Sequence, residues 1–246
     1  MNKITNYFNY LKSFFFKPEQ ENTQEIIQEI ILEDTQDNKQ ENKIINLDWI
    51  LNAYPIHKRE IIANTVDPIR YGTILLALED IIKNNIPGSI AECGVFQGYT
   101  SKFIHNIIPD RHFYLFDTFE GFHTNDLDSE TDERFRDTSI DFVKNYIGIS
   151  ENIIFKQGYF PETTIGLEAE EFAFVMIDFD KYKPTLTALE FFYPRVGTGG
   201  YIFIHDYNNP ESDWACSKAL DLFLKGKPEK HVAIPDCWGT ALFKKV

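Results

Sequence analysis

The residues best placed to do chemistry are polar side chains that follow two apolar segments. Asp178 and Asp180 follow one such segment, and His205 and Asp206 follow the next. Residues two apart on an extended chain project to the same side, so the carboxylates of Asp178 and Asp180 should point together. Carboxylate and water oxygens suit Mg²⁺, and imidazole titrates near neutral pH. The pattern predicts a metal or acid–base centre built from these four residues.

A second candidate is the turn within Ile90-Ala-Glu-Cys-Gly-Val-Phe-Gln-Gly-Tyr-Thr100. A short apolar run ends at Glu92, Gly94 and Gly98 follow, and apolar residues then recur at the helical period. Glycine permits a sharp turn, and a strand, a glycine turn and a helix N-terminus commonly meet a nucleotide-like ligand. Gln97 stands where the dinucleotide fingerprint needs glycine, which disfavours NAD. An ordinary surface turn is the alternative.

Asp117 is a third candidate, at the end of the aromatic-rich segment Phe113-Tyr-Leu-Phe-Asp117. An ionised carboxylate only accepts hydrogen bonds, so it suits both hydroxyls of a ribose. The alternative is an ordinary aspartate in a turn. Because Asp117 follows the glycine turn along the chain, we favour the ribose contact.

Apolar segments alternating with helical patterns must position these side chains. Five segments predict parallel strands, and two short ones predict a closing hairpin: one ending at Glu92, then 113–117, 153–156, 172–178, 199–204, 231–234 and 240–243. Helices are expected at 74–82, from Thr100 onward, at 184–193 and around 215–223. This order predicts an α/β, three-layer fold with a seven-stranded, mostly parallel sheet and an antiparallel last strand.

The chain before the first strand differs in composition. Residues 1–43 predict an amphipathic helix with an aromatic stripe, followed by an acidic linker. The stripe suits a membrane surface or a protein contact, and we favour a contact that makes a homo-oligomer. Residues 44–246 form the predicted main domain, with lid or cap helices at 44–88 and the catalytic core at 89–246.

Two polar segments have open roles. Residues 65–71 are expected to break the cap helices, and Arg70 within them is either a contact for a ligand carboxylate or, as we favour, a solvated surface residue. The acidic tract 125–137 is either a flap over the site or a solvated loop.

Composition excludes some classes of partner. A net charge of −14 argues against nucleic acid, which requires a basic surface. Three cysteines without CxxC spacing fit reduced thiols and a cytoplasmic location. No apolar run approaches the roughly 20 residues that span a bilayer, so no transmembrane segment is expected.

Five stretches, in order over about residues 60–225, resemble the macrocin O-methyltransferase family. Its members are metal-dependent sugar O-methyltransferases that use S-adenosylmethionine and have the doubly wound, Rossmann-like class I methyltransferase fold. The matching stretches are Pro87-Gly-Ser-Ile-Ala-Glu-Cys-Gly-Val95, Leu115-Phe-Asp-Thr-Phe-Glu-Gly121, Gln157-Gly-Tyr-Phe-Pro-Glu-Thr163, Ile177-Asp-Phe-Asp-Lys-Tyr-Lys-Pro-Thr185 and Gly199-Gly-Tyr-Ile-Phe-Ile-His-Asp-Tyr207.

The resemblance implies roles for particular residues. Those that would hold S-adenosylmethionine are Glu92, Gly94, Gly98, Asp117, Thr118, Gln157, Gly158, Tyr159, Phe160 and Asp178. Those that would hold a divalent metal, Mg²⁺ or Mn²⁺, are Asp178, His205 and Asp206. Asp180 would be the general base, with His205 as a second catalytic residue.

One position departs from the family's metal-dependent pattern. That pattern reads Asp-Asp-Tyr, whereas this chain reads His205-Asp206-Tyr207. Replacing a carboxylate by imidazole weakens a Mg²⁺ site and favours a softer divalent ion. Two alternatives stay open: His205 acts as a base without metal, or His205 has no chemical role.

The sequence therefore predicts an S-adenosylmethionine-dependent O-methyltransferase of a sugar or sugar-like hydroxyl. The acceptor is expected to be a small molecule such as a sugar or sugar nucleotide, in surface polysaccharide or glycosylated metabolite biosynthesis. One alternative is methylation of a phosphorylated or phosphoramidate group, a catechol or an amine. The other is a non-catalytic protein that binds the cofactor.

Overall fold

The structure is a computed structural model that describes residue 62 and residues 65–127 and 132–246. The predicted N-terminal helix and linker (1–43) and most of the first cap segment lie outside these residues. Within the described part of the chain, no helix is both long enough and apolar enough to cross a bilayer.

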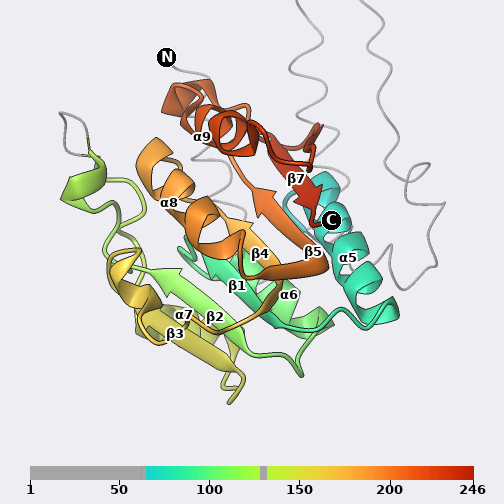
Figure 1. Cartoon of the computed structure of the whole chain (residues 1–246). Coiled ribbons are helices and arrows are strands. Elements are labelled where there is room, and N and C mark those ends of the chain that lie inside the picture. The colour runs from blue at the N-terminus through green and yellow to red at the C-terminus, as the bar shows by residue number, and fades with distance from the viewer. Residues whose placement is uncertain (1–61, 63–64, 128–131) are drawn as a thin grey trace, which may run out of the picture. The chain divides into compact units, whose positions relative to one another are not determined.

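A seven-stranded sheet with the order β3-β2-β1-β4-β5-β7-β6 forms the centre of this part (Figure 1). The strands are β1 (Ser89–Cys93), β2 (Phe113–Asp117), β3 (Ile153–Gln157), β4 (Phe172–Ile177), β5 (Val196–Ile204), β6 (Val232–Ile234) and β7 (Thr240–Lys244). β7 runs antiparallel to both of its neighbours, and the first five strands pair in parallel. The predicted sheet is confirmed.

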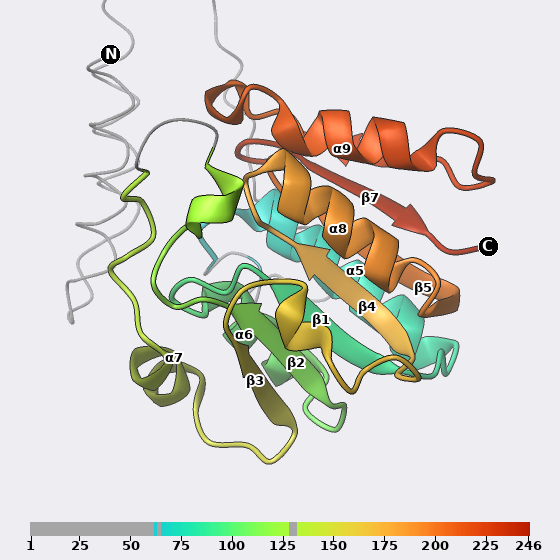
Figure 2. The same ribbon diagram turned by 60° about the vertical axis from the view of Figure 1, so that its left-hand side comes forward.

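Helices cover both faces of the sheet. The five α-helices described after residue 64 are α5 (Pro68–Lys83), α6 (Tyr99–Ile107), α7 (Ile140–Ile147), α8 (Tyr182–Phe192) and α9 (Ala215–Leu224). α5, α6 and α7 pack in one apolar core, and α8 and α9 pack in the other. Figure 2 shows α8 and α9 together on the near side of the sheet. The three layers are as predicted.

The two cores explain why the central strands are almost continuously apolar. Every residue of β1 and β4 is buried. Successive side chains of a strand point to opposite faces, so Phe174 enters the core beneath α5 and Val175 enters the core beneath α8. A parallel strand covered on both faces has no solvent-facing positions to fill with polar residues.

Three element starts differ from the sequence predictions by two residues or more. α5 begins at Pro68 instead of residue 74, because Asp67 caps it by accepting from the backbone N–H groups of Ile69 and Arg70. The expected break is confirmed at residues 65–67, and its extension to residue 71 is wrong because residues 68–71 form the first turn of α5. β5 begins at Val196 instead of residue 199, and α8 begins at Tyr182 instead of residue 184, since proline is tolerated within a first turn.

The sequence prediction missed α7 altogether. Ser139 caps this helix through its hydroxyl, and Val143 and Ile147 bury the apolar side of its two turns. Gly148, with φ +104°, ends it. The cap and the apolar spacing are visible in the sequence, but the preceding acidic tract obscures a helix of only eight residues.

Candidate active site

Four polar residues meet where β4 and β5 end. Asp178 directly follows β4, and His205 and Asp206 directly follow β5. Nδ1 of His205 lies 3.0 Å from Oδ1 of Asp178 and 3.4 Å from Oδ2 of Asp206. Asp180 is 8% exposed, and its carboxyl group lies close enough to that of Asp206 for the two to interact. The structure thus brings together the four residues selected from the sequence.

Two of these residues have an unusual backbone conformation. Asp180 has φ +58° and Asp206 has φ +57°, each just after the end of its strand. The left-handed region costs a non-glycine residue about 1–3 kcal/mol, and such strain clusters at functional sites. Both strained residues belong to the cluster of polar side chains after β4 and β5.

The charges of the cluster are strongly coupled. Burial, and then the nearby Asp206 carboxylate, raise the pKa of Asp180 well above its usual value. Burial would also raise the pKa of Asp206, but the hydrogen bond and charge of His205 outweigh it and lower that pKa. Burial would lower the pKa of His205, but the charge of Asp178 together with the contacts to Asp178 and Asp206 raises the pKa of the imidazole well above its usual value. The two neighbouring carboxyl groups therefore differ in proton affinity, with the pKa of Asp180 raised and that of Asp206 lowered.

The donor set of the cluster fits a divalent metal. Asp178, His205 and Asp206 each offer one ligand atom, and these atoms lie within 4.8 Å of one another. Nε2 of His205 lies 3.2 Å from the Cys237 carbonyl oxygen, which leaves Nδ1 to face the carboxylates. Metal-bound histidines usually donate their other N–H to such a group. One nitrogen and two carboxylate ligands suit Mn²⁺ at least as well as Mg²⁺.

Asn209 is a member of this cluster that the sequence analysis missed. It is 3% exposed and donates from Nδ2 to Oδ1 of Asp206 at 3.0 Å. Its position in the loop after β5 gives no sequence signal, because asparagine is common in turns.

The glycine turn lies beside the cluster. Gly94 has φ +85°, and a Cβ at this position would stand 1.9 Å from the Asp178 carbonyl oxygen. The Asp178 N–H also donates to Cys93 O at 2.8 Å. Glycine is thus required so that the backbone after β1 can touch the backbone after β4, which joins the turn to the carboxylate cluster.

Asp117 shapes this turn. Its Oδ2 accepts from the backbone N–H groups of Val95 (2.7 Å) and Phe96 (2.9 Å), and its Oδ1 accepts from Phe119 (2.7 Å). A carboxylate offers about four acceptor positions, so three of them are already used. The remaining capacity suits one ribose hydroxyl rather than both.

Three predicted cofactor residues lie inside the protein. Glu92 is 2% exposed and accepts a short hydrogen bond from Ser101 of α6, and burial raises its pKa well above the usual value. Phe160 is 4% exposed in the core beneath α8. Gly98 starts α6, and a Cβ there would meet Val143 of α7 at 2.9 Å. Packing explains these three residues without a ligand.

The other predicted residues of the cofactor site line the edge beside Asp117. Gln157 is exposed and pairs with Asp117 in the sheet register, and Gly158 N–H donates to Asp117 O at 3.0 Å. The Tyr159 hydroxyl donates to Asp126 at 2.8 Å. Thr118 donates to Gly121 O at 2.6 Å and closes a tight turn.

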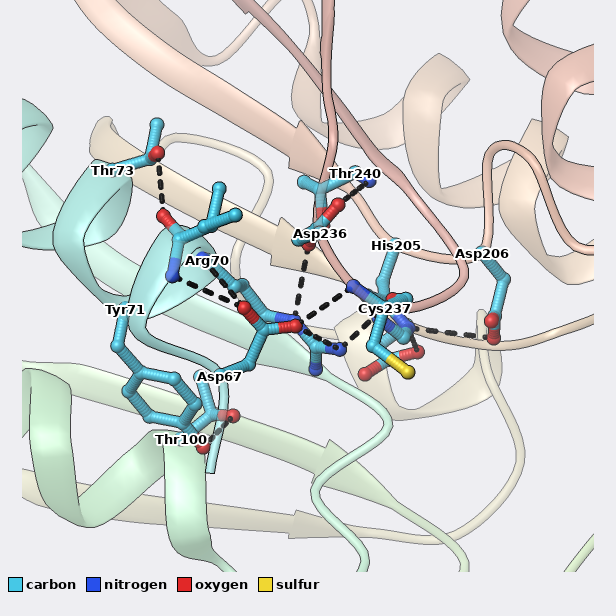
Figure 3. Close-up of polar contacts among 12 residues, drawn as sticks. Asp67, Arg70, Tyr71, Thr73, Thr100, His205, Asp206, Asp236, Cys237 and Thr240 are labelled. Carbon is cyan, nitrogen blue, oxygen red and sulfur yellow. Dashed lines mark hydrogen bonds and ion pairs between the residues drawn. The ribbon is translucent and has the colours of Figure 1, made fainter. Parts of the chain in front are cut away.

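Arg70 is not the solvated residue that we favoured. Its side chain is 12% exposed and lies among two carboxylates and a backbone carbonyl (Figure 3). Nε donates to Asp236 Oδ2 at 3.3 Å, and Nη2 donates to Cys237 O at 3.2 Å. Desolvation would lower the pKa of Arg70, but the negative charges of Asp178 and Asp67 raise it.

The described part of the acidic tract is tied to the segment that follows the cluster. Asp132 accepts hydrogen bonds from Nε of Arg134 to both of its carboxylate oxygens and from Nη2 of Arg134 to Oδ2, and it lies 3.0 Å from the Lys181 ammonium. The Lys181 ammonium also stands over the Phe122 ring, 4.5 Å from its centroid. The tract is therefore not simply a solvated loop.

The sheet order, the glycine turn and the strand-end carboxylates define a class I, Rossmann-like methyltransferase fold. The O-methyltransferase NovP has a similar structure, with a TM-score of 0.61 and 24% identity over 73% of this chain and 80% of that chain. The calicheamicin methyltransferase CalS11 has a TM-score of 0.58 and 17% identity over 92% of this chain and 94% of its own. These similarities concern the fold.

A family model described as macrocin-O-methyltransferase (TylF) matches residues 19–231, and this chain belongs to that family. Among its relatives, the demethyldecarbamoylnovobiocin O-methyltransferase of Streptomyces niveus is 28% identical over 65% of this chain and 64% of the relative. The 8-demethyl-8-(2,3-dimethoxy-alpha-L-rhamnosyl)-tetracenomycin-C 4'-O-methyltransferase of Streptomyces olivaceus is 26% identical over 56% and 60%. The matched segments therefore span less than two thirds of each relative.

Proposed function

We propose that this protein transfers the methyl group of S-adenosylmethionine to a hydroxyl of a sugar unit carried by a small molecule. The observation that carries the proposal is the cluster of Asp178, Asp180, His205 and Asp206 at the carboxyl edge of the sheet. Ligands of open α/β sheets bind at this edge. Membership of the macrocin O-methyltransferase family supports the same reaction class.

The donor would bind along the ends of β1, β2 and β3. The turn at Gly94 brings backbone N–H groups to this edge, and Asp117 retains about one acceptor position for a ribose hydroxyl. Gln157, Gly158 and Tyr159 would border the adenine. Glu92, Gly98 and Phe160 would act indirectly, by packing beneath these groups.

We further propose that Asp178, Asp206 and Nδ1 of His205 hold a divalent metal, Mn²⁺ or Mg²⁺. When bound, such an ion lowers the pKa of a coordinated hydroxyl. Asp180 would accept the hydroxyl proton, and its raised pKa makes its ionised form a stronger base. The buried side chains around the cluster would exclude water and keep the acceptor oxygen in line with the methyl group.

The acceptor class rests on the relatives. The name of the S. olivaceus relative includes a rhamnosyl group, and CalS11 is described as a TDP-rhamnose 3'-O-methyltransferase. We therefore propose a deoxyhexose hydroxyl as the acceptor. The sugar could be carried by a glycosylated metabolite, by a sugar nucleotide or by a surface polysaccharide precursor.

Two measurements test the proposal. Titration calorimetry with S-adenosylhomocysteine tests the donor site, and a methyl-transfer assay over rhamnosides, TDP-sugars and catechols tests the acceptor. Binding without transfer to any acceptor would favour a non-catalytic protein, and absence of binding would overturn the donor assignment. Exhaustive chelation should abolish transfer, and added Mn²⁺ or Mg²⁺ should restore it. Undiminished turnover in chelator would eliminate the metal and favour His205 as a base.

A further inference from the structure

Arg134 is a cation beside the carboxylate cluster that the proposed reaction does not use. Its side chain is 36% exposed, and Nε and Nη2 both donate to the Asp132 carboxylate, at 2.9 and 2.8 Å. This hydrogen bonding raises the pKa of Arg134, partial burial opposes the rise, and the negative charges of Asp180 and Asp206 add to it. The guanidinium is therefore fixed within electrostatic range of the cluster.

Lys181 lies beside Arg134. The Lys181 ammonium is 3.0 Å from Oδ2 of Asp132, the oxygen that also accepts from Nη2 of Arg134. Both cations also stand over the Phe122 ring, Lys181 at 4.5 Å and Arg134 at 5.3 Å from its centroid. A shared oxygen and a shared ring hold these two charges together. Lys181 directly follows Asp180 in the chain, so the cation pair borders the proposed base.

The segment that carries Arg134 is also attached to the glycine turn. The Thr138 hydroxyl donates to Phe96 O at 2.5 Å, and Gln97 Nε2 donates to Asp137 O at 3.0 Å. Phe96 and Gln97 lie between β1 and α6, in the turn proposed to meet the methyl donor. Arg134 is therefore held between the donor turn and the segment that follows β4.

Most hydrogen-bond donors of the cation pair are unused. A guanidinium has five N–H groups, and in Arg134 the two on Nη1 and one on Nη2 have no acceptor among the described residues. An ammonium has three N–H groups, and within the same part of the chain that of Lys181 donates to Asp132 alone. Asp132 balances one of the two charges. One positive charge and several donors remain for a ligand.

A phosphate group matches this pair. A guanidinium binds phosphate through two parallel hydrogen bonds, and an ammonium adds a point charge. The net charge of −14 argues against a nucleic-acid polymer, but a phosphorylated small molecule needs only a local pair of cations. The carboxylates of Asp178 and Asp206 repel a phosphate and can accept from a neutral hydroxyl. The two halves of the site therefore suit the two ends of a sugar phosphate.

We propose that Arg134 and Lys181 bind the phosphate attached to C1 of the acceptor sugar, and so direct a hydroxyl of its ring to the cluster. The inference rests on the proposed function, since it names the acceptor class of the same site. Both a sugar 1-phosphate and a nucleoside diphosphate sugar carry this chemistry. Neither cation takes part in proton transfer, so both residues determine specificity.

The first experiment compares three acceptors that share one sugar: TDP-rhamnose, rhamnose 1-phosphate and methyl rhamnoside. We expect wild type to use a phosphorylated acceptor best, and the better of the two identifies the source of the phosphate. Arg134→Gln and Lys181→Met should each lower kcat/KM for that acceptor about 10–100-fold, mainly through KM, as for loss of a hydrogen bond between charged groups. Methyl rhamnoside should be nearly unaffected. An equal loss with all three acceptors, or better use of methyl rhamnoside by wild type, would overturn the inference.

The second experiment needs no methyl transfer. TDP and rhamnose 1-phosphate are titrated calorimetrically into protein with S-adenosylhomocysteine and Mn²⁺ present. A contact between phosphate and metal would be common to all variants, so the ratio of Kd values reports the cation pair. Kd should rise about 10–100-fold in Arg134→Gln and Lys181→Met. This result without any transfer would refute the proposed reaction and leave the phosphate site standing. If neither ligand binds, or both variants bind as wild type does, the inference is overturned.

Arg136→Gln is the matched control. Arg136 lies two residues further along the same segment, is 53% exposed and pairs with Glu133. The substitution removes the same charge and should leave the preference for a phosphorylated acceptor unchanged. An equal loss of preference in Arg136→Gln and Arg134→Gln would show a general charge effect and overturn the inference. If Arg134→Gln does not fold, Lys181→Met decides, because it leaves the pair of Asp132 and Arg134 intact.

Discussion

Gly94→Ala tests how closely the donor turn and the carboxylate cluster depend on one another. An added Cβ would lie 1.9 Å from the Asp178 carbonyl oxygen and 2.8 Å from its carbonyl carbon. Non-bonded heavy atoms rest at about 3.5–4.0 Å. The backbone after β1 must therefore move away from the backbone after β4 by more than about 1 Å, which stretches the Asp178 N–H to Cys93 O hydrogen bond.

Two effects contribute to the expected loss of folding free energy in Gly94→Ala. An alanine at φ +85° costs about 1–2 kcal/mol because of its left-handed backbone. Forcing a methyl group into a packed contact costs a further 1–3 kcal/mol or so. The sum is about 2–5 kcal/mol, which lowers Tm by roughly 4–20 °C in a domain of this size. A shift of about 1 Å at Asp178 should also reduce turnover by about 10²-fold.

Gly166→Ala is the matched control. Gly166 has φ +86°, almost the value of Gly94, and a Cβ there meets no atom within 4 Å. The Gly166→Ala substitution should therefore lower the free energy of unfolding only through the left-handed backbone of the new alanine, by about 1–2 kcal/mol. Calorimetric unfolding and the affinity for S-adenosylhomocysteine are measured for both variants. If Gly94→Ala loses no more stability than Gly166→Ala, the close approach of the two strand ends is refuted.

Two more substitutions separate chemistry from packing. Asp180→Asn should lower turnover by at least about tenfold, within the range for a general base, with cofactor affinity nearly unchanged; wild-type turnover would refute the role of Asp180. Glu92→Gln tests the buried carboxyl, whose pKa is raised chiefly by burial. Between the usual pKa of 4.5 and the raised folded-state pKa, the folded protein keeps a proton on Glu92 that the unfolded chain has released. The contribution of Glu92 to the free energy of unfolding is therefore complete below pH 4.5 and is lost as the pH rises toward the folded-state pKa. The Tm of Glu92→Gln relative to wild type should therefore increase between pH 5 and pH 8, and an equal difference at both pH values would contradict this.

The fold was predictable because its signals are local. The strands of a doubly wound sheet are short apolar runs, and those buried on both faces need no partner to be recognised. Their ends mark one edge of the sheet, so Asp178, Asp180, His205 and Asp206 were grouped correctly before any contact was known. The errors fell on element starts and on α7, where a cap or a short apolar pattern competes with polar surroundings.

The interior positions were less predictable. Phe160 belongs to a matching stretch, but only packing shows that its ring fills the core beneath α8. Glu92 ends an apolar run, yet its partner is Ser101 of the next helix. A sequence pattern shows that a residue is special. It does not show whether the cause is a ligand or a neighbour.

The sequence alone determined the order of the strands, every described α-helix except α7, the glycine turn and the chemistry of the strand ends, because each depends on residues close together in the chain. Only the tertiary structure decided which distant residues form hydrogen bonds with the glycine turn and with the residues around the strand ends. Asp117 accepts hydrogen bonds from the backbone of the glycine turn, which lies 21 and 22 residues earlier in the chain. Arg70 donates to the carbonyl oxygen of Cys237, which lies 167 residues later. Such contacts depend on how distant elements pack, and no local pattern records them. The ring orientation of His205 is therefore a property of the folded chain.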